Sequence, residues 1–125
     1  MLILSKALVS IVAVIHLYFL ALQMFLWTTP FGLNTFKMTI EDATIMEKLA
    51  ANQGLYNSFL AAGLIAGLIA RSPIVAKTLI VFCLICVIVA GVYGAWSVAP
   101  RILFIQSLPA MLALIAVVMS GQQKV

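Results

Sequence analysis

Four long apolar segments dominate this sequence and limit what it can fold into. They lie at about residues 2–27, 49–70, 76–98 and 102–120, and few charged residues interrupt them. A helix needs about 20 mostly apolar residues to cross the hydrocarbon core of a bilayer. Each segment is long enough to span a membrane as an α-helix, so the pattern predicts four transmembrane helices.

The composition excludes an ordinary soluble domain. Hydrophobic residues make up 66% of the 125-residue chain and charged residues only 8%, whereas soluble domains are about 45–50% apolar and about 25% charged. The positive charges are scattered singly, which is typical of membrane-protein loops and not of a nucleic-acid surface. We therefore expect an all-α membrane protein, a single domain folded as an antiparallel four-helix bundle, with the lipid bilayer as a partner and no nucleic acid.

Local signals place the ends of the expected helices. The first helix has no small-residue cleavage site after it, so we interpret it as a retained helix and not as a signal peptide. Thr39 followed by Asp42 resembles a capping box, with acidic residues where the helix dipole favours them. The second helix is therefore expected to begin near Ile40, before its apolar part. Short loops then favour antiparallel neighbours. The expected helices span about residues 2–27, 40–70, 76–98 and 102–120.

The distribution of cations indicates an orientation. With four spans, both termini and the loop of residues 71–77 share one side, which carries four Lys or Arg residues against three on the other. Positive charge favours the cytoplasmic side. We expect a multi-pass protein of the bacterial inner membrane with both termini in the cytoplasm.

Polar side chains gather at one depth on three of the expected helices. His16, Gln23 and Trp27 share one face of the first helix, residues 52–57 open the apolar part of the second, and Gln106 lies in the fourth. Lipid cannot hydrogen-bond an amide, so such groups face protein, trapped water or a ligand. We expect a polar pocket in the outer half of the membrane with His16 as its floor. The candidate ligand-binding residues are His16, Gln23, Asn52, Gln53, Tyr56, Asn57 and Gln106.

Two interpretations of this polar cluster stay open at this point. One is a ligand pocket, and the other is a hydrogen-bond network that only holds the helices together. Interhelical polar contacts in membranes average only about 0.6 kcal/mol, so several of them would be a costly way to gain stability. Pro109 also frees the carbonyl of Ile105 beside Gln106, and that kink either widens the pocket or simply bends the helix.

Small residues on the second and third helices have simpler interpretations. Gly63 and Gly67 allow a close approach of two helices, either within the chain or in a homo-oligomer. Cys83 and Cys86 form a C-x-x-C spacing inside an apolar run with no basic neighbour, so we interpret them as small packing residues and not as a redox pair. One His and two distant Cys do not make a metal site. We expect no metal and no cofactor.

The string Asn52-Gln53-Gly54-Leu55-Tyr56-Asn57, with Phe59 to Gly63 after it, resembles the signature of the DUF1304 family. The face from His16 to Trp27 and the Gln106-x-x-Pro109-Ala110 element fit that family as well. The resemblance implies a small four-helix bacterial integral membrane protein of unknown function. In the family the position that matches Gln23 is usually Glu. Gln23 cannot ionise, so either this member does not need the charge or the chain is a variant that has lost it.

Three functions follow from these residues. The first is a membrane protein that binds a small polar or amphiphilic molecule, with His16 changing its charge near neutral pH. A broader version of this hypothesis adds transport of the same molecule. The second is a membrane-embedded enzyme that acts on a lipophilic substrate, with His16 as acid/base and nearby polar groups stabilising charge. The isomerase or epimerase type of such an enzyme is implied only by the resemblance to the family. The third is a structural or regulatory subunit. We take the first as our expectation.

Overall fold

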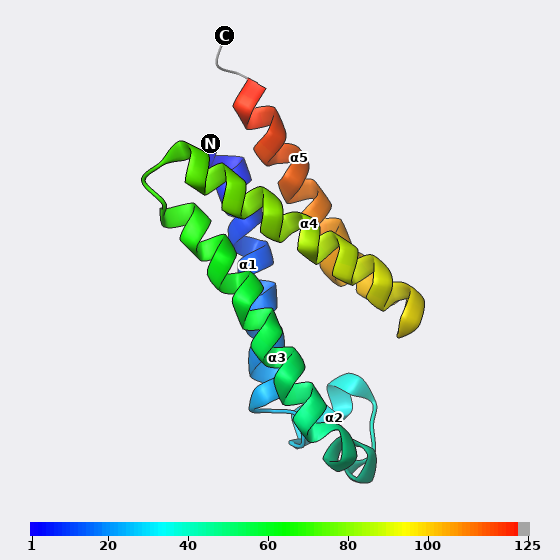
Figure 1. Ribbon diagram of the computed structural model, residues 1–125. Helices are drawn as coiled ribbons and strands as arrows, with labels where there is room; N and C mark the ends of the chain where they lie inside the picture. Colours follow the sequence, from blue (N-terminus) through cyan, green and yellow to red (C-terminus); the bar gives the residue numbers. More distant parts are fainter. Residues whose placement is uncertain (123–125) are drawn as a thin grey trace. The chain divides into compact units, whose positions relative to one another are not determined.

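The computed structural model describes residues 1–122, and all regular structure within them is helical. The all-α class is therefore confirmed. Figure 1 shows the helices in chain order, with a π-helical segment, η1, directly before the last one. The elements are α1 (Ile3–Met24), α2 (Pro30–Phe36), α3 (Ile40–Ile69), α4 (Pro73–Ser97), η1 (Leu103–Ser107) and α5 (Leu108–Gln122).

Helix α2 lies between the first two expected helices, in a segment for which no helix was expected. The Thr29 hydroxyl accepts a hydrogen bond of 3.3 Å from the Gly32 amide, and Pro30 supplies the fixed φ that favours a first helical turn. Lys37 ends the helix in the left-handed conformation, with φ 53°. The helix is only seven residues long, so it has too few turns for a hydrophobic periodicity to reveal it.

Side-chain caps also start the two longest helices. The Thr39 hydroxyl accepts a hydrogen bond of 3.2 Å from the Asp42 amide, and α3 begins at Ile40 as its capping residues indicated. Ser72 caps α4 in the same way, with Pro73 at the first position. Helix α4 therefore begins about one turn earlier than the apolar pattern alone predicted.

Three helices of the described chain are long and apolar enough to cross a membrane. They are α1, α4 and the stretch Leu103–Gly121 that combines η1 with most of α5. Helix α3 has 30 residues but is not among them. Its charged first turns and the polar residues of the 52–57 string lower its hydropathy. The fourth span stays a prediction.

The chain divides into two compact units, and helices α1 and α3 contribute to both. The first comprises residues 1–15 and the chain from Leu60 onward, and we call it the core unit. The second comprises His16–Phe59, and we call it the polar unit because it contains most of the predicted site residues. The expectation of a single domain stays a prediction.

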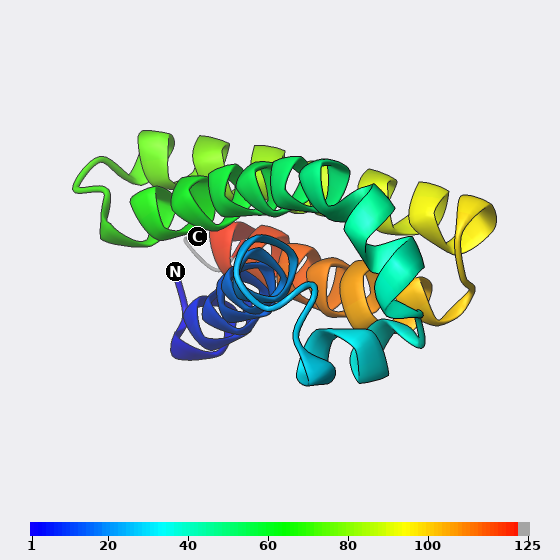
Figure 2. The same ribbon diagram turned by 90° about the horizontal axis from the view of Figure 1, so that it is seen from below.

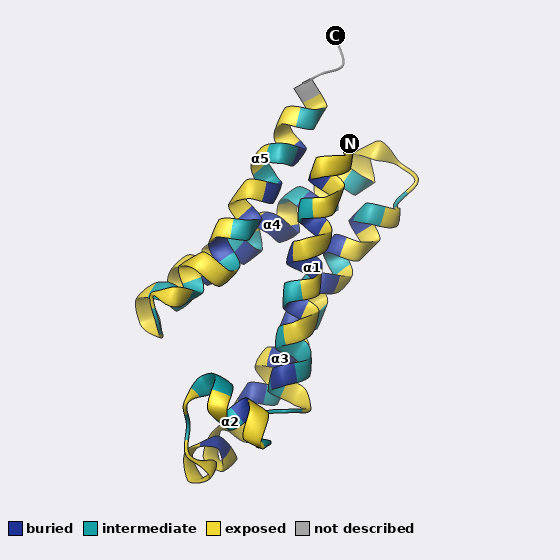
Figure 3. Cartoon of the chain, turned by 180° about the vertical axis from the view of Figure 1, so that it is seen from behind, coloured by how far each residue is buried: buried dark blue, intermediate teal, exposed yellow. Residues whose placement is uncertain are grey.

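Interlocking small and branched side chains pack the core unit. Gly63 faces the Cys83 sulfur, and a Cβ at Gly67 would lie 2.6 Å from Cγ1 of Ile80, so α3 and α4 approach closely at these glycines. This face thus packs inside the chain, and a second copy at the same face stays a prediction. In Figure 3 buried and exposed positions alternate along α4 and α5. The buried residues are Val9, Val12, Ala13, Leu64, Ile80, Cys83, Leu84, Val87, Ala110, Ala113 and Val117.

The last candidate span, Leu103–Gly121, begins as a π-helix just before Pro109. The Leu108 amide bonds to the Leu103 carbonyl, five residues back, and Pro109 has no amide hydrogen with which to continue an α-helical ladder. The buried Ser107 hydroxyl donates a 3.0 Å hydrogen bond to the Ile88 carbonyl of α4. Gly91 leaves room for that hydroxyl. The proline thus lies beside a π-helical turn that is joined to α4.

Candidate functional site

The polar unit brings α1 and α3 together at Gly54, in the middle of the 52–57 string. A Cβ at this position would lie 2.7 Å from Cγ of Met24, 3.1 Å from Cβ of Gln23 and 3.3 Å from the Leu20 carbonyl oxygen. Only a residue without a side chain allows the two backbones to approach this closely. The glycine in the string therefore sets the distance between the two helices.

One helical turn after Gly54, two of the predicted site residues meet. Nδ2 of Asn57 donates a 2.8 Å hydrogen bond to Oε1 of Gln23 and a 3.2 Å hydrogen bond to the Gln53 carbonyl. Only 6% of Asn57 is exposed, and Gln23 is half-buried. We call Gln23 and Asn57 the amide pair. It joins α1 and α3 by a hydrogen bond between their side chains.

The amide pair keeps unused hydrogen-bonding groups. An amide side chain has two N–H donors and one oxygen acceptor. Both N–H groups of Asn57 donate within the protein, to Oε1 of Gln23 and to the Gln53 carbonyl. In the part of the chain that the structure describes, Nε2 of Gln23 and Oδ1 of Asn57 make no hydrogen bond to protein. The pair can therefore offer one donor group and one acceptor to a further molecule.

His16 lies two turns before Gln23 on the same face of α1. It is fully buried, and its ring meets the ring of Phe19 edge-on with centroids 6.1 Å apart. Helical geometry places it roughly 10 Å from Gln23 along the axis. The residue is thus held in a packed position within the polar unit. Its role as floor of a pocket or as an acid/base stays a prediction.

Three other predicted residues have exposed side chains. Asn52, Gln53 and Tyr56 are exposed, and Tyr56 contacts Phe59 edge-on with ring centroids 5.8 Å apart. Asn57 and Gly54, three residues apart, share the face of α3 that packs on α1. Asn52 and Tyr56 fall on the neighbouring face, so the structure does not bring them to the amide pair.

Gln106 belongs to the core unit. It lies in η1, half-buried, next to the buried Ser107 that bonds to α4. The π-helical turn contains one residue more than an α-helical turn. It therefore changes the direction in which the Gln106 side chain projects from the helix axis. The expected pocket with walls from three helices stays a prediction.

A contact of Trp27 that was not expected from the sequence joins the end of α1 to α2 and to the start of α3. Nε1 of Trp27 donates a 3.0 Å hydrogen bond to the Ala43 carbonyl in the first turns of α3, and its ring lies 4.7 Å from that of Phe36. Figure 2 shows the chain leaving α1, turning through α2 and entering α3. The sequence placed Trp27 only on the helix face that also carries His16 and Gln23. The Thr29-Pro30 cap is the signal that could have revealed the fold of this segment.

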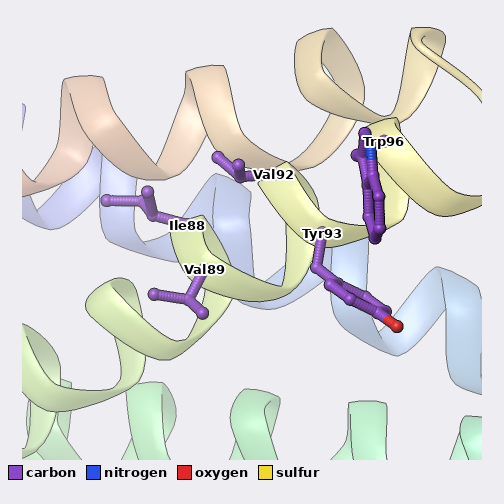
Figure 4. Close-up of a pocket in the computed structure, with 5 residues that line it drawn as sticks. All are labelled: Ile88, Val89, Val92, Tyr93 and Trp96. Carbon is purple, nitrogen blue, oxygen red and sulfur yellow. The ribbon is translucent and has the colours of Figure 1, made fainter.

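The core unit carries an apolar groove on one face of α4. Figure 4 shows the five side chains that line it, all from this helix, and its volume is about 430 Å³. Tyr93 and Trp96 are 64% and 81% exposed and lie near the end of α4, a helix long and apolar enough to cross a membrane. None of the predicted site residues lines this groove. Its lining residues are Ile88, Val89, Val92, Tyr93 and Trp96.

Comparison with known proteins gives one match. The model of a family described as "Protein of unknown function (DUF1304)" matches residues 10–118. No curated protein and no solved structure matches the chain. The match covers the whole 52–57 string, the amide pair and the π-helical turn.

Proposed function

This chain belongs to the DUF1304 family of proteins of unknown function, and we propose its function from the amide pair. It is an integral membrane protein that binds a small polar or amphiphilic molecule beside Gln23 and Asn57. The observation that carries this proposal is the 2.8 Å hydrogen bond between the two side chains, together with the donor and acceptor that the pair leaves unused. A bilayer supplies no partner for those groups, so a ligand with polar atoms would satisfy them.

The unused groups indicate the kind of ligand. Nε2 of Gln23 is a donor and Oδ1 of Asn57 is an acceptor. A molecule that carries both an acceptor and a donor, such as a primary amide or a hydroxylated headgroup, would bond to both. A molecule with acceptors alone, such as an ester, would bond to only one. We therefore propose an amphiphile with a hydrogen-bond donor in its polar part.

We further propose that α3 forms the fourth span. Its 30 residues are enough to cross the bilayer, and the contact with α1 at Gly54 covers the buried amide of Asn57. The exposed polar residues Asn52, Gln53 and Tyr56 would then lie near the outer end of the span. With four spans, both termini lie on the same side of a bacterial inner membrane. The larger number of Lys and Arg residues on that side favours the cytoplasm. Reporter fusions at the loops of residues 25–39 and 71–72 test this topology, because they should give opposite signals.

A structural role is the second candidate, and the same hydrogen bond favours it. Asn57 uses both of its N–H groups within the protein, as a side chain would if its only task were to fix the register of α1 and α3. The two candidates differ in one respect. A structural pair needs no ligand, so a change to it should affect stability alone.

Photolabelling separates the two candidates. The probe is a fatty primary amide that carries a diazirine next to its headgroup, and the matched comparison is a fatty methyl ester with the diazirine at the same carbon. The protein is reconstituted in lipid nanodiscs, irradiated and digested, and the labelled peptides are identified by mass spectrometry. We expect the amide probe, and much less the ester, to label peptides that contain residues 16–23 and 53–57.

Variants make the labelling specific. Gln23→Leu and Asn57→Leu should each lower labelling by the amide probe about five-fold, since each removes one hydrogen bond to the ligand. Asn34→Leu is the matched control, because Asn34 is an exposed residue of α2 outside the site. Equal labelling of the wild type, both site variants and the control would refute the binding site. If the site variants then unfold more easily, the structural role remains.

A further inference from the structure

A second groove lies between the first turns of α1 and the last turns of α5, within the core unit. Its volume is about 350 Å³, which is within the range of ligand sites. Leu4 and Leu8 line it from α1, and Leu112 and Met119 line it from α5. Ser5 also lines the groove, but its hydroxyl donates to the Leu2 carbonyl at 2.8 Å. The groove therefore offers an almost purely apolar surface.

The place of the groove limits what can fill it. Both of its walls belong to helices that are long and apolar enough to cross a membrane. Side chains on both walls are exposed, including Leu4 at 65% and Met119 at 60%. In a bilayer such a surface meets hydrocarbon. The occupant is therefore either an acyl chain or an apolar helix of another protein.

Cations surround the end of the core unit at which this groove lies. Figures 1 and 2 show the start of α1, the α3–α4 connection and the end of α5 at one end of the unit. Lys6 and Arg71 are exposed at this end, and Nζ of Lys77 lies 3.1 Å from the position that a Cβ of Gly121 would occupy. Every acidic residue of the chain lies between positions 41 and 47, in the polar unit. The sequence of the core unit therefore contains no Asp or Glu side chain that could compete for these cations.

We infer that this groove holds one acyl chain of an anionic phospholipid, with its headgroup at Lys6 and Lys77. The distance along α5 from Leu112 to Met119 is roughly 10 Å, so the groove covers the upper part of an acyl chain within one leaflet of about 15 Å. Basic side chains at the ends of transmembrane helices attract anionic headgroups. A second copy of this chain would bring like charges together at the same end, which disfavours it as occupant.

Lipid binding by the purified chain tests this inference. Dimyristoyl phosphatidylglycerol and dimyristoyl phosphatidylcholine have identical acyl chains and differ in headgroup charge. Each is titrated into the protein in mild detergent, and bound lipids are counted by native mass spectrometry. We expect the anionic lipid to bind preferentially. Lys6→Gln and Lys77→Gln should each weaken its binding about five-fold and leave the zwitterionic lipid unchanged.

Two matched pairs of variants separate a site from general attraction. Arg101→Gln removes a cation at the opposite end of the core unit, and it should have no effect. Ala116→Phe fills the groove, in which Ala116 is a lining residue, and should abolish preferential binding. Ala66→Phe adds the same ring at an exposed position outside the groove and serves as its control. Ala116→Leu repeats the test with less bulk, and circular dichroism checks that each variant is folded.

Three results would overturn the inference. One is an equal loss of lipid for Arg101→Gln and Lys6→Gln, which would show unspecific attraction. The second is unchanged lipid binding by folded Ala116→Phe and Ala116→Leu. The third is a dimer that Ala116→Phe dissociates, which would identify a second copy as the occupant. All of these residues lie in the core unit, so the outcome is independent of the amide pair.

Discussion

Asn57 and Gln23 are 34 residues apart in the chain, yet their side-chain amides are joined by a 2.8 Å hydrogen bond. Gly54, one turn before Asn57, makes this bond geometrically feasible, because α1 and α3 touch through its bare backbone. The close approach of the two helices and the hydrogen bond between their side chains therefore depend on each other. A substitution of either residue of the amide pair, or of the glycine, should change the contacts of the other two residues.

The coupling within the amide pair can be measured with a double-mutant cycle of Gln23→Leu and Asn57→Leu. Hydrogen bonds between transmembrane helices contribute about 0.6 kcal/mol on average and up to about 1.7 kcal/mol. We expect a coupling energy within that range in the free energy of unfolding, measured by denaturant titration in bicelles. Strictly additive effects of the two substitutions would show that the bond contributes nothing to stability.

The close approach at Gly54 predicts a strong position dependence among glycines. In Gly54→Ala the new methyl group would lie 3.3 Å from the Leu20 carbonyl oxygen and still closer to two side chains of α1. We expect a loss of about 1–3 kcal/mol in the free energy of unfolding. Gly94→Ala is the matched control, because its methyl group would meet only the Ile102 side chain, at 3.2 Å or more. Similar losses for both variants would contradict the role of Gly54.

The residues of this site show how far the sequence could predict it. Polar residues within apolar runs are expected to face protein, and the hydrogen bond between Gln23 and Asn57 agrees with that expectation. The start of α3 follows from its Thr39 cap. Which face of α3 meets α1 could not be predicted. Asn52 with Tyr56 and Gln53 with Asn57 form two neighbouring stripes of similar polarity. The rotation of the helix about its axis decides between them, and that rotation depends on packing at Gly54.

Two further features depend on contacts that are distant in sequence. Pro109 lacks an amide hydrogen, which indicates that the α-helix is interrupted near it. The sequence alone does not decide whether the interruption is a kink or a π-helical turn. The Ser107 hydroxyl bonds to α4 across 19 residues, and this partner cannot be inferred from local spacing. Helix α2 likewise depends on the Thr29 cap and on packing within the polar unit, where Phe36 contacts Trp27. Short elements of this kind have too few residues for a periodic signal.

The pairing of Ser107 with Gly91 predicts non-additive effects. Ser107→Ala removes the donor to the Ile88 carbonyl and should cost about 1 kcal/mol. Gly91→Ala alone should cost more, because its methyl group would collide with the Ser107 hydroxyl. In the double variant that hydroxyl is absent, so the loss in unfolding free energy should be smaller than the sum. Additive losses would show that the hydroxyl is not the obstacle at Gly91.

Replacement of the Trp27 indole should have a local effect on residues 28–46 of the polar unit. Trp27→Phe keeps an aromatic ring beside Phe36 but removes the N–H that donates to the Ala43 carbonyl. A neutral hydrogen bond contributes about 1 kcal/mol, so amide exchange should become about five-fold faster across residues 28–46. Hydrogen exchange read by mass spectrometry provides the measurement. Trp96→Phe is the control, because Trp96 is 81% exposed on α4. Since that ring lies outside the polar unit, its replacement should leave exchange in residues 28–46 unchanged. Faster exchange there in both variants would mean that the indole bond does not hold this segment.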